Sequence, residues 1–289
     1  MDRSMLTISI PTYNRFAFLD WTLTKTHKDF PNCEIVVSDN CSTDDTRTVQ
    51  TRPNVKYLAQ QRNIGAFPNF RDALLAGTSK YVCYLGDDDY LLPDQVEKGI
   101  QYLEDHPGVL AYYAPCQLYN EVEQKPEWNA FYVAQNETFH DPVKLWNFLI
   151  HNHVWPEHAI FRREGLERIL QPRERAYWAF VDVANAFNNG PIHFASSPYY
   201  RNITVHPVGH RSKLGDEQCL TDFDEYRAGL EVCAAELFKG RLNDDLKAKL
   251  RPMIQAFINA RLAVAHKLLT MQGRQSWADS IEKRLQICA

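Results

Sequence analysis

The first hundred residues alternate between short apolar segments and longer segments that are apolar on one face, which indicates a repeating strand–helix order. Strands are predicted at Met5–Ile10, Glu34–Ser38, Val55–Leu58 and Tyr81–Leu85. Helices are predicted at residues 15–28, Phe67–Ala76 and Pro93–Asp105, with Pro93 in the first helical position. This order predicts an α/β fold in which helices flank a mostly parallel sheet.

The pattern changes twice further along the chain. Residues 109–205 are less regular and contain an aromatic-rich stretch between 128 and 155. Strands are expected there at Val109–Tyr113, Ala159–Arg162 and Tyr199–Val205, with helical pieces around Leu166 and Val183. Beyond residue 215 apolar residues recur at helical spacing only. The sequence therefore divides into a region 1–211 and a C-terminal, all-helical region 212–289.

Composition narrows the class of protein. Of the 289 residues, 45% are hydrophobic and 24% are charged, a balance that excludes a disordered or fibrous chain. The formal net charge of -4 argues against a dedicated nucleic-acid binder. The sequence has no run of 18 apolar residues and no apolar signal-peptide segment at its start. Its seven scattered cysteines lack a Cys-x-x-Cys pair, so a cytoplasmic protein is expected.

Three consecutive carboxylates follow the fourth predicted strand, in the sequence Gly86-Asp87-Asp88-Asp89. Adjacent carboxylates repel one another unless a cation or several hydrogen-bond donors neutralise them. Mg²⁺ and Mn²⁺ prefer carboxylate oxygens, so this loop is a candidate metal site. The alternative is a solvated loop whose aspartates favour the N-terminus of the next helix. Gly86 has no side chain and would let a ligand approach the backbone closely.

A second polar loop, residues 39–45, follows the second predicted strand. Ligands of open α/β sheets bind at the carboxyl ends of the strands, where this loop begins. Asp39 is therefore a candidate to accept hydrogen bonds from the edge of a planar base. Ser42, Asp44 and Thr46 are expected to cap the following helix instead.

Four short segments carry a family resemblance. They are Ile-Ser-Ile-Pro-Thr-Tyr-Asn-Arg (8–15), Val-Val-Ser-Asp-Asn-Cys-Ser-Thr-Asp-Asp-Thr (36–46), Gln-Arg-Asn-Ile-Gly (61–65) and Leu-Gly-Asp-Asp-Asp-Tyr-Leu-Leu-Pro-Asp (85–94). In this order and spacing they resemble family 2 inverting glycosyltransferases of the GT-A fold. The resemblance covers residues 5 to about 105 and continues less specifically to about 210. It implies a Rossmann-like GT-A domain over residues 1–211, with a nucleotide-sugar half at about 1–105 and an acceptor half at about 106–211.

The resemblance also implies which residues bind the nucleotide sugar. They would be Pro11, Thr12, Tyr13, Arg15, Asp39, Arg62, Asn63, Asp87 and Asp88. The first three would line the nucleotide base, and Asp39 would accept a hydrogen bond from the imino group of that base.

The metal, Mn²⁺ or Mg²⁺, would be bound by Asp88, with Asp89 as a second candidate, and by His206. The family usually has Asp-x-Asp-Asp at the acidic loop, and here Gly86 stands in the first of these positions. That departure leaves open how Asp87, Asp88 and Asp89 share their roles. A lone histidine such as His206 is otherwise often a packing or hydrogen-bonding residue.

By resemblance, the catalytic base would be Asp182, in a segment where Val181 stands in place of the family's common glutamate. The alternative is that Asp182 caps a helix. His151, His153 and His158 suggest zinc only weakly, because apart from Glu157 no acidic or cysteine cluster accompanies them, and a role near the acceptor is the other functional interpretation. Aromatic residues between 128 and 155 can stack on sugar rings, although packing is expected for most of them.

The implied reaction moves a sugar from a nucleoside-diphosphate sugar, with a UDP-sugar favoured, to a hydroxyl of a glycan or lipid-linked acceptor. The metal would stabilise the departing diphosphate, and a carboxylate would remove the hydroxyl proton, with inversion at the anomeric carbon. Synthesis of a bacterial surface polysaccharide is the expected context. A non-catalytic nucleotide-sugar-binding or scaffolding protein of the same fold is the competing interpretation. A sugar nucleotidyltransferase is disfavoured because its Gly-rich first loop is absent.

The C-terminal helices have three expected roles. They would pack on the catalytic domain, pair with a second subunit, or rest peripherally on anionic lipid at the inner face of the membrane. Residues 211–289 hold 13 Lys and Arg and 11 Asp and Glu, a net charge of +2. So small an excess favours packing or oligomerisation over lipid contact.

Overall fold

The computed structural model describes residues 3–172, 175–209, 223–271 and 273–288. Its strands are β1 (Leu6–Thr12), β2 (Glu34–Asp39), β3 (Val55–Ala59), β4 (Tyr81–Tyr84), β5 (Tyr90–Leu91), β6 (Ala111–Tyr113), β7 (Cys116–Asn120), β8 (Lys125–Asn129), β9 (Glu137–Phe139), β10 (Ala159–Arg162), β11 (Ile192–Phe194) and β12 (Tyr200–Val205). Its helices are α1 (Phe16–Asp29), α2 (Ala66–Leu75), α3 (Pro93–Asp105), α4 (Pro142–His151), α5 (Leu166–Ile169), α6 (Trp178–Asn189), α8 (Phe223–Leu237), α9 (Asp244–Met271) and α10 (Gln275–Cys288). Short 3-10 helices are η1 (Arg3–Met5), η2 (Asp45–Thr51) and η3 (Arg163–Gly165).

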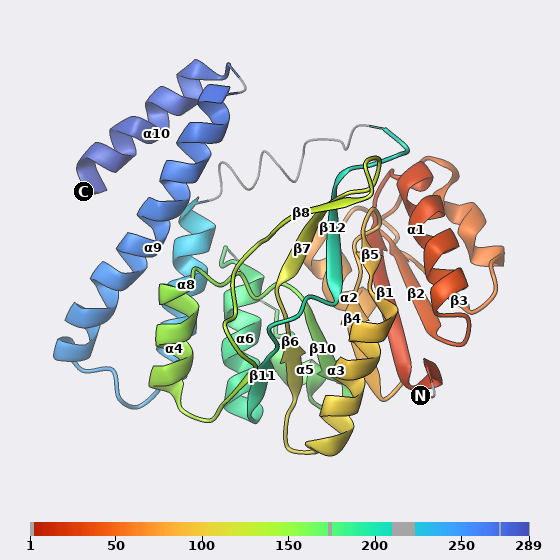
Figure 1. The fold of residues 1–289 in the computed structure, drawn as a ribbon, viewed down its shortest axis with the longest axis horizontal. Helices are drawn as coiled ribbons and strands as arrows, with labels where there is room; N and C mark the ends of the chain where they lie inside the picture. The colour runs from red at the N-terminus through yellow and green to blue at the C-terminus, as the bar shows by residue number, and fades with distance from the viewer. Residues whose placement is uncertain (1–2, 173–174, 210–222, 272, 289) are drawn as a thin grey trace.

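The strands of the described chain form two sheets (Figure 1). The larger sheet has the order β3–β2–β1–β4–β10–β6–β11–β9, and the smaller has the order β5–β12–β7–β8. Strands β1, β2, β3 and β4 run parallel, as do β6 and β11, whereas β10 is antiparallel to both of its neighbours. The predicted α/β fold, a mostly parallel sheet flanked by helices, is confirmed.

Helices cover both faces of the large sheet. On one face, Ile8 and Ile10 of β1 belong to a buried cluster with apolar residues of α1 and α3. On the other face, Val82 of β4 belongs to a second cluster with residues of α2 and α6. Strands covered on both faces are buried along almost their whole length, and here they are largely apolar, with the buried polar residues Thr7 and Ser9 in β1.

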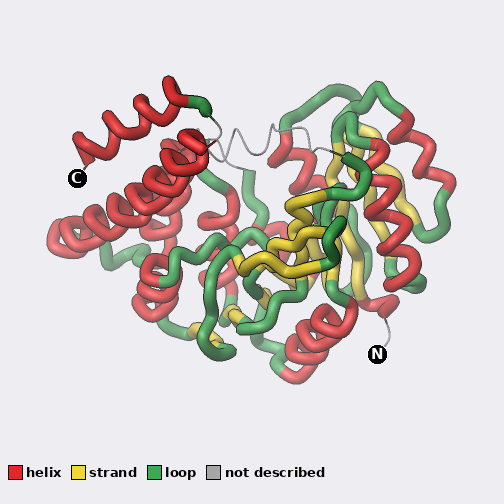
Figure 2. Tube along the Cα trace, turned by 45° about the horizontal axis from the view of Figure 1, so that its top comes forward, coloured by secondary structure: helices red, strands yellow, loops and turns green. Residues whose placement is uncertain are grey.

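The C-terminal helices share the second cluster. Phe257 of α9 and Leu230 of α8 are buried in it together with Phe180 of α6. Figure 2 shows α9 and α10 at the end of the molecule opposite to the start of the chain. The boundary expected near residue 212 lies outside the described residues, but hydrophobic packing continues across it from one region to the other.

Most predicted elements lie within one or two residues of the observed ones. Helix α3 begins at Pro93 and β10 spans Ala159–Arg162, as predicted. Strands β5, β7, β8 and β9 were not predicted, and of these β8 is exposed along its whole length and shows no apolar alternation. The expected packing of aromatic residues is confirmed for Trp146, which is buried, whereas Trp128 on β8 is 63% exposed.

Candidate active site

Three segments far apart in the sequence meet at the carboxyl edge of the large sheet. Thr12 is paired with Asp39 in the register of β1 and β2. The Leu85 amide donates to the Ser9 carbonyl at 2.9 Å, so β4 delivers the acidic loop to the same edge. This is the edge at which open α/β sheets bind ligands.

The first two aspartates of the acidic loop contact the loop after β1. The Thr12 hydroxyl donates to Oδ2 of Asp87 at 2.7 Å. Nε of Arg15 lies 3.3 Å from Oδ1 of Asp87, and Nη2 pairs with Oδ2 of Asp88. Both aspartates are only 7% exposed, and burial raises the pKa of Asp87 while the Arg15 charge opposes that change. A buried pair of carboxylates is thus balanced here by one guanidinium.

Asp89 is bound in a different way. Its Oδ2 accepts from the Tyr200 hydroxyl at 2.7 Å and from Nδ2 of Asn202 at 3.2 Å, and its Oδ1 accepts from the Ile203 amide at 2.9 Å. All three donors lie on β12, so Asp89 joins the small sheet to the acidic loop. Its expected role as a second metal ligand stays a prediction.

Gly86 leaves room for this anchor. A Cβ atom at position 86 would lie 2.8 Å from Oδ2 of Asp89 and 3.1 Å from the Tyr200 hydroxyl oxygen. That oxygen also accepts a hydrogen bond from the Gly86 amide at 2.9 Å. The close approach that the sequence suggests for a ligand is therefore made by Asp89 and Tyr200.

Asp39, the expected base-binding residue, is 4% exposed and held at both oxygens. Its Oδ2 accepts from the Tyr57 hydroxyl, and its Oδ1 accepts from the Ser42 amide at 2.9 Å. Pro11 is half-buried on the neighbouring strand β1. The carboxylate of Asp39 is thereby fixed in orientation at the end of β2.

The polar residues after Asp39 were expected to cap a helix. Asp44 does so, because it is the N-cap of η2 and accepts from the Thr46 amide at 3.1 Å. The Thr46 hydroxyl donates to the same carboxylate. Ser42 acts differently, since its Oγ accepts from the Asn14 amide at 2.8 Å and so ties this loop to the one after β1.

The loop after β3 is tied to the same edge through Asn40. Nδ2 of Asn40 donates to Oδ1 of Asn63 at 3.0 Å, and its Oδ1 accepts from the Ile64 amide at 2.8 Å. Arg62 and Asn63 are exposed, and Tyr13 in the loop after β1 is 41% exposed. These predicted nucleotide-binding residues therefore face solvent.

His206 is 5% exposed and packs against α1. Its ring centroid lies 4.8 Å from that of Phe18 and 4.4 Å from that of Trp21, and Cζ of Arg15 lies 4.9 Å from the Phe18 centroid. Nδ1 of His206 accepts from the Val208 amide at 3.1 Å, which leaves the ring proton of the neutral form on Nε2. Metal binding through Nε2 would require that proton to leave, so metal ligation by His206 stays a prediction.

Asp182 lies in the second turn of α6 and is 2% exposed. Tyr177 is the N-cap of this helix, so the alternative that Asp182 caps it is wrong. Burial, and then the charge of Asp182, raise the pKa of Tyr113 at the carboxyl end of β6. Strands β6 and β4 point the same way because both are antiparallel to β10. The charge of Asp182 therefore acts on a side chain at the carboxyl end of β6, which is two strands from β4 in the sheet.

The carboxylates of the acidic loop suit a metal ion that binds together with the phosphates of a substrate. Across the described residues, no three His, Cys, Asp or Glu side chains form a group that could hold a metal ion. Mg²⁺ usually takes only one or two carboxylates and completes its shell with water and substrate phosphates. Asp87 and Asp88 offer such oxygens, and the Arg15 guanidinium already occupies a cation's position beside them.

Sequence reasoning missed three residues that hold this site together: Tyr57, Tyr200 and Asn40. The two tyrosines bind Asp39 and Asp89 across 18 and 111 residues, so no local pattern identifies them. Asn40 lies next to Asp39 in one of the segments that carry the family resemblance, and that position could have identified it as a site residue.

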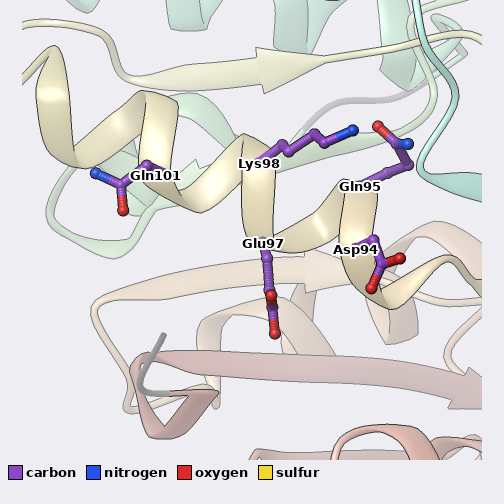
Figure 3. A pocket seen from close by; sticks show the side chains of 5 residues that line it. All are labelled: Asp94, Gln95, Glu97, Lys98 and Gln101. Atoms are coloured by element: carbon purple, nitrogen blue, oxygen red, sulfur yellow. The ribbon is translucent and has the colours of Figure 1, made fainter.

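A surface hollow of about 460 Å³ lies elsewhere, on α3 (Figure 3). Figure 3 shows that its lining side chains all extend from that one helix: Asp94, Gln95, Glu97, Lys98 and Gln101. None belongs to the loops that carry the buried carboxylates, so this hollow is separate from the candidate site.

The family described as Glycosyl transferase family 2 matches residues 7–170. A curated relative, GalNAc(5)-diNAcBac-PP-undecaprenol beta-1,3-glucosyltransferase of Campylobacter jejuni, is 34% identical over 94 residues, which cover 30% of each chain. The alignments cover less than half the length of this and the first curated relatives.

Two solved structures have the same fold. S. aureus TarS 1–349 in complex with UDP-GlcNAc has a TM-score of 0.64 at 18% identity, over 89% of this chain and 72% of that one. The mannosyltransferase PcManGT from Pyrobaculum calidifontis, in complex with GDP-Man and Mn²⁺, has a TM-score of 0.58 at 17% identity, over 98% and 84%. In the described part of the chain, no helix has both the length and the apolar character needed to cross a bilayer.

Proposed function

The chain belongs to glycosyl transferase family 2, and we propose that it transfers a sugar from a nucleoside-diphosphate sugar to a hydroxyl group of an acceptor. One observation carries the proposal: a buried carboxylate pair, Asp87 and Asp88, is paired with the single guanidinium of Arg15 at the edge where Asp39 is also fixed. A nucleoside diphosphate carries negative charge and binds with a metal ion. Arg15 is a suitable partner for its phosphate oxygens, and the two carboxylates are suitable partners for the metal ion.

Asp88, with Asp87 beside it, would hold Mn²⁺ or Mg²⁺. When bound, the cation supplies positive charge that stabilises the departing diphosphate. Arg15 would then exchange its ion pairs with the aspartates for contacts with phosphate oxygens, which a guanidinium binds well. The Mn²⁺ in the complex of PcManGT, a protein of the same fold, supports a divalent cation for this chain.

Asp39 would orient the nucleotide by accepting a hydrogen bond from the base, with Pro11, Thr12 and Tyr13 along the base. The rigid hold of Tyr57 on the Asp39 carboxylate supports this role, because a fixed acceptor selects the hydrogen-bonding pattern of a base. Arg62 and Asn63 would contact the nucleotide from the loop after β3. We favour a UDP-sugar as the donor, in line with the UDP-GlcNAc bound to the TarS structure.

Asp182 would act as the general base. The attacking hydroxyl has a high pKa, so a carboxylate must take its proton as the new bond forms. Attack from the face opposite the diphosphate inverts the anomeric carbon. The effect of the Asp182 charge on the pKa of Tyr113, at the carboxyl end of β6, supports this assignment.

The acceptor would be a glycan or a lipid-linked sugar in bacterial surface polysaccharide synthesis, on the cytoplasmic side of the membrane. The undecaprenol-linked substrate in the name of the Campylobacter relative supports this class. Residues 1–211 would form the catalytic domain, and residues 212–289 would pack on it or mediate contact with a second subunit.

A screen of nucleotide sugars tests this proposal. Melting temperature is measured by thermal shift with UDP-, GDP- and dTDP-sugars, each with Mn²⁺ and with EDTA, and nucleotide release is then measured for the donors that bind. The proposal predicts that one nucleotide class stabilises the protein in a metal-dependent way and is turned over. Binding without turnover would support the alternative of a non-catalytic nucleotide-sugar-binding protein.

A further inference from the structure

Glu157 lies at the edge that carries the acidic loop, although it comes from a different part of the sequence. It lies two residues before β10, and β10 is antiparallel to β4, with Ile160 opposite Cys83. The start of β10 is therefore next to the end of β4. Glu157 and its neighbour His158 extend this start toward the loop that follows β4.

Ring stacking connects this segment to the acidic loop. The His158 ring stacks on Tyr200 with centroids 3.7 Å apart, and the Tyr200 hydroxyl donates to Asp89 at 2.7 Å. Burial raises the pKa of Tyr84, and the three aspartates of the acidic loop and Glu157 raise it further. The charge of Glu157 thus acts on the same tyrosine as the charges of the acidic loop do.

The Glu157 carboxyl is held in place, and the side chain remains partly open to solvent. The Tyr177 hydroxyl donates to Oε1, and the charge of Arg261 on α9 acts on the same carboxyl. Burial raises the pKa of Glu157, and Tyr177 and Arg261 oppose that rise. The side chain as a whole is still 34% exposed, and its Oε2 lies 3.8 Å from Nε2 of His158.

A group of half-buried aromatic rings includes Tyr177, whose hydroxyl donates to this carboxyl, and two rings with centroids 5.8 and 5.9 Å from that of Tyr177. They are those of Trp155, Tyr177 and Trp178. Trp155 packs on α8 and α9, with centroids 4.9 Å from Tyr226 and 5.4 Å from Phe257, and Cζ of Arg261 lies 5.2 Å from its ring. The rings of Trp155 and Tyr177 are therefore held by the C-terminal helices, and all three rings retain exposed surface.

We propose that Glu157 and these half-buried rings bind a sugar ring of the acceptor. Carboxylates accept hydrogen bonds from sugar hydroxyls, and an aromatic face packs against the apolar C–H face of a pyranose. Recessed apolar surface with a few fixed polar groups is the usual composition of a small-molecule site. The proposal rests on the proposed glycosyl transfer, and it gives α9 a direct part in the site through Arg261 and Phe257.

Binding of simple glycosides tests this site. The full chain is loaded with UDP and Mg²⁺, and saturation-transfer NMR measures binding of methyl β-D-glucopyranoside, methyl β-D-galactopyranoside and methyl N-acetyl-β-D-glucosaminide. We expect wild type to bind at least one of them and Glu157→Gln to bind it about tenfold or more weakly, because a charged acceptor is lost. Tyr177→Phe, which keeps the ring but releases the carboxyl, should give a smaller loss.

Glu127→Gln on the exposed strand β8 is the matched control and should bind like wild type. The affinity for UDP and the melting temperature should be the same in Glu157→Gln and wild type. Equal glycoside binding by wild type and Glu157→Gln, or no glycoside binding by wild type, would overturn the inference. So would a parallel loss of UDP affinity and thermal stability in Glu157→Gln, which would indicate a purely structural carboxyl. Failure of wild type to bind UDP would instead contradict the proposed function.

Discussion

Arg15 has a double role at the residue scale. Without a ligand its guanidinium pairs with Asp87 and Asp88, and this pairing offsets part of the negative charge of two carboxylates that are almost completely buried. A divalent cation at the same carboxylates must displace it, because the two positive charges would repel each other at this distance. Arg15 therefore opposes metal binding until a diphosphate offers it a new partner.

Replacement of Arg15 should separate its effect on metal binding from its effect on diphosphate binding. In Arg15→Gln, Mn²⁺ alone should bind about tenfold more tightly than in wild type, since no ion pair has to break. The gain in Mn²⁺ affinity on adding UDP should shrink. Electron paramagnetic resonance of free Mn²⁺ measures both values. Arg52→Gln, which breaks a surface pair with Asp20, is the control, and unchanged Mn²⁺ affinity in Arg15→Gln would refute the competition.

The assignment of Asp182 gives a second prediction at this scale. Asp182→Asn keeps the shape of the side chain but cannot accept a proton, so kcat should fall about 10²–10⁴-fold. UDP affinity should stay within about twofold, because Asp182 lies on α6 and not on the nucleotide loops. Nucleotide-release kinetics and calorimetry measure the two quantities. The exposed Asp245→Asn is the control, and wild-type turnover in Asp182→Asn would exclude this base.

At the scale of elements, the turn between β4 and β5 depends on a residue without a side chain. A Cβ atom at Gly86 would push against Asp89 and Tyr200, which join this turn to β12. Gly86→Ala should lower the free energy of unfolding by about 1–3 kcal/mol and weaken UDP binding, as expected for overpacking. Gly108→Ala is the matched control, because a Cβ there meets no atom within 4 Å. Equal urea unfolding curves for the two variants would contradict this view of the turn.

The sequence predicts a helix or strand correctly where the spacing of apolar residues agrees with residues that start or end such elements. Pro93 marks the start of α3, and the apolar run Ala159–Arg162 is β10. The acidic loop could be singled out because three aspartates are adjacent in the chain. The residues that bind the aspartates of the site could not be predicted, because Tyr57 and Tyr200 are brought to Asp39 and Asp89 only by the pairing of strands. For the same reason Glu157 showed no site signal beyond its place beside a histidine.

At the scale of the whole molecule, the C-terminal helices share a core with the sheet. Phe257 of α9 is 1% exposed and lies in one cluster with Phe180 of α6 and Phe194 of β11. Such continuity predicts one cooperative unfolding transition for the chain. It also means that the proposed boundary at residue 212 separates regions of sequence that depend on one another for stability.

A substitution that creates a cavity in this shared core tests the prediction of a single unfolding transition. Phe257→Ala should lower the free energy of unfolding by about 3–5 kcal/mol. Urea unfolding followed by circular dichroism and by tryptophan fluorescence should show the same midpoint with both probes. Met271→Ala, at a residue 74% exposed, should change little. Two separate transitions, with only the helical one shifted in Phe257→Ala, would show that the C-terminal helices fold independently.

The central claim is that the buried carboxylates bind a cation and, through it, a nucleoside diphosphate. Calorimetry of UDP binding to wild type and Asp88→Asn, with Mn²⁺ and with EDTA, tests it most directly. The account predicts that wild type binds UDP at least about tenfold more tightly with Mn²⁺ than with EDTA, because the metal ion links the carboxylates of the protein to the diphosphate. Asp88→Asn should lose that difference. Equal UDP affinity of wild type with Mn²⁺ and with EDTA, or an undiminished Mn²⁺ effect in Asp88→Asn, would contradict the account.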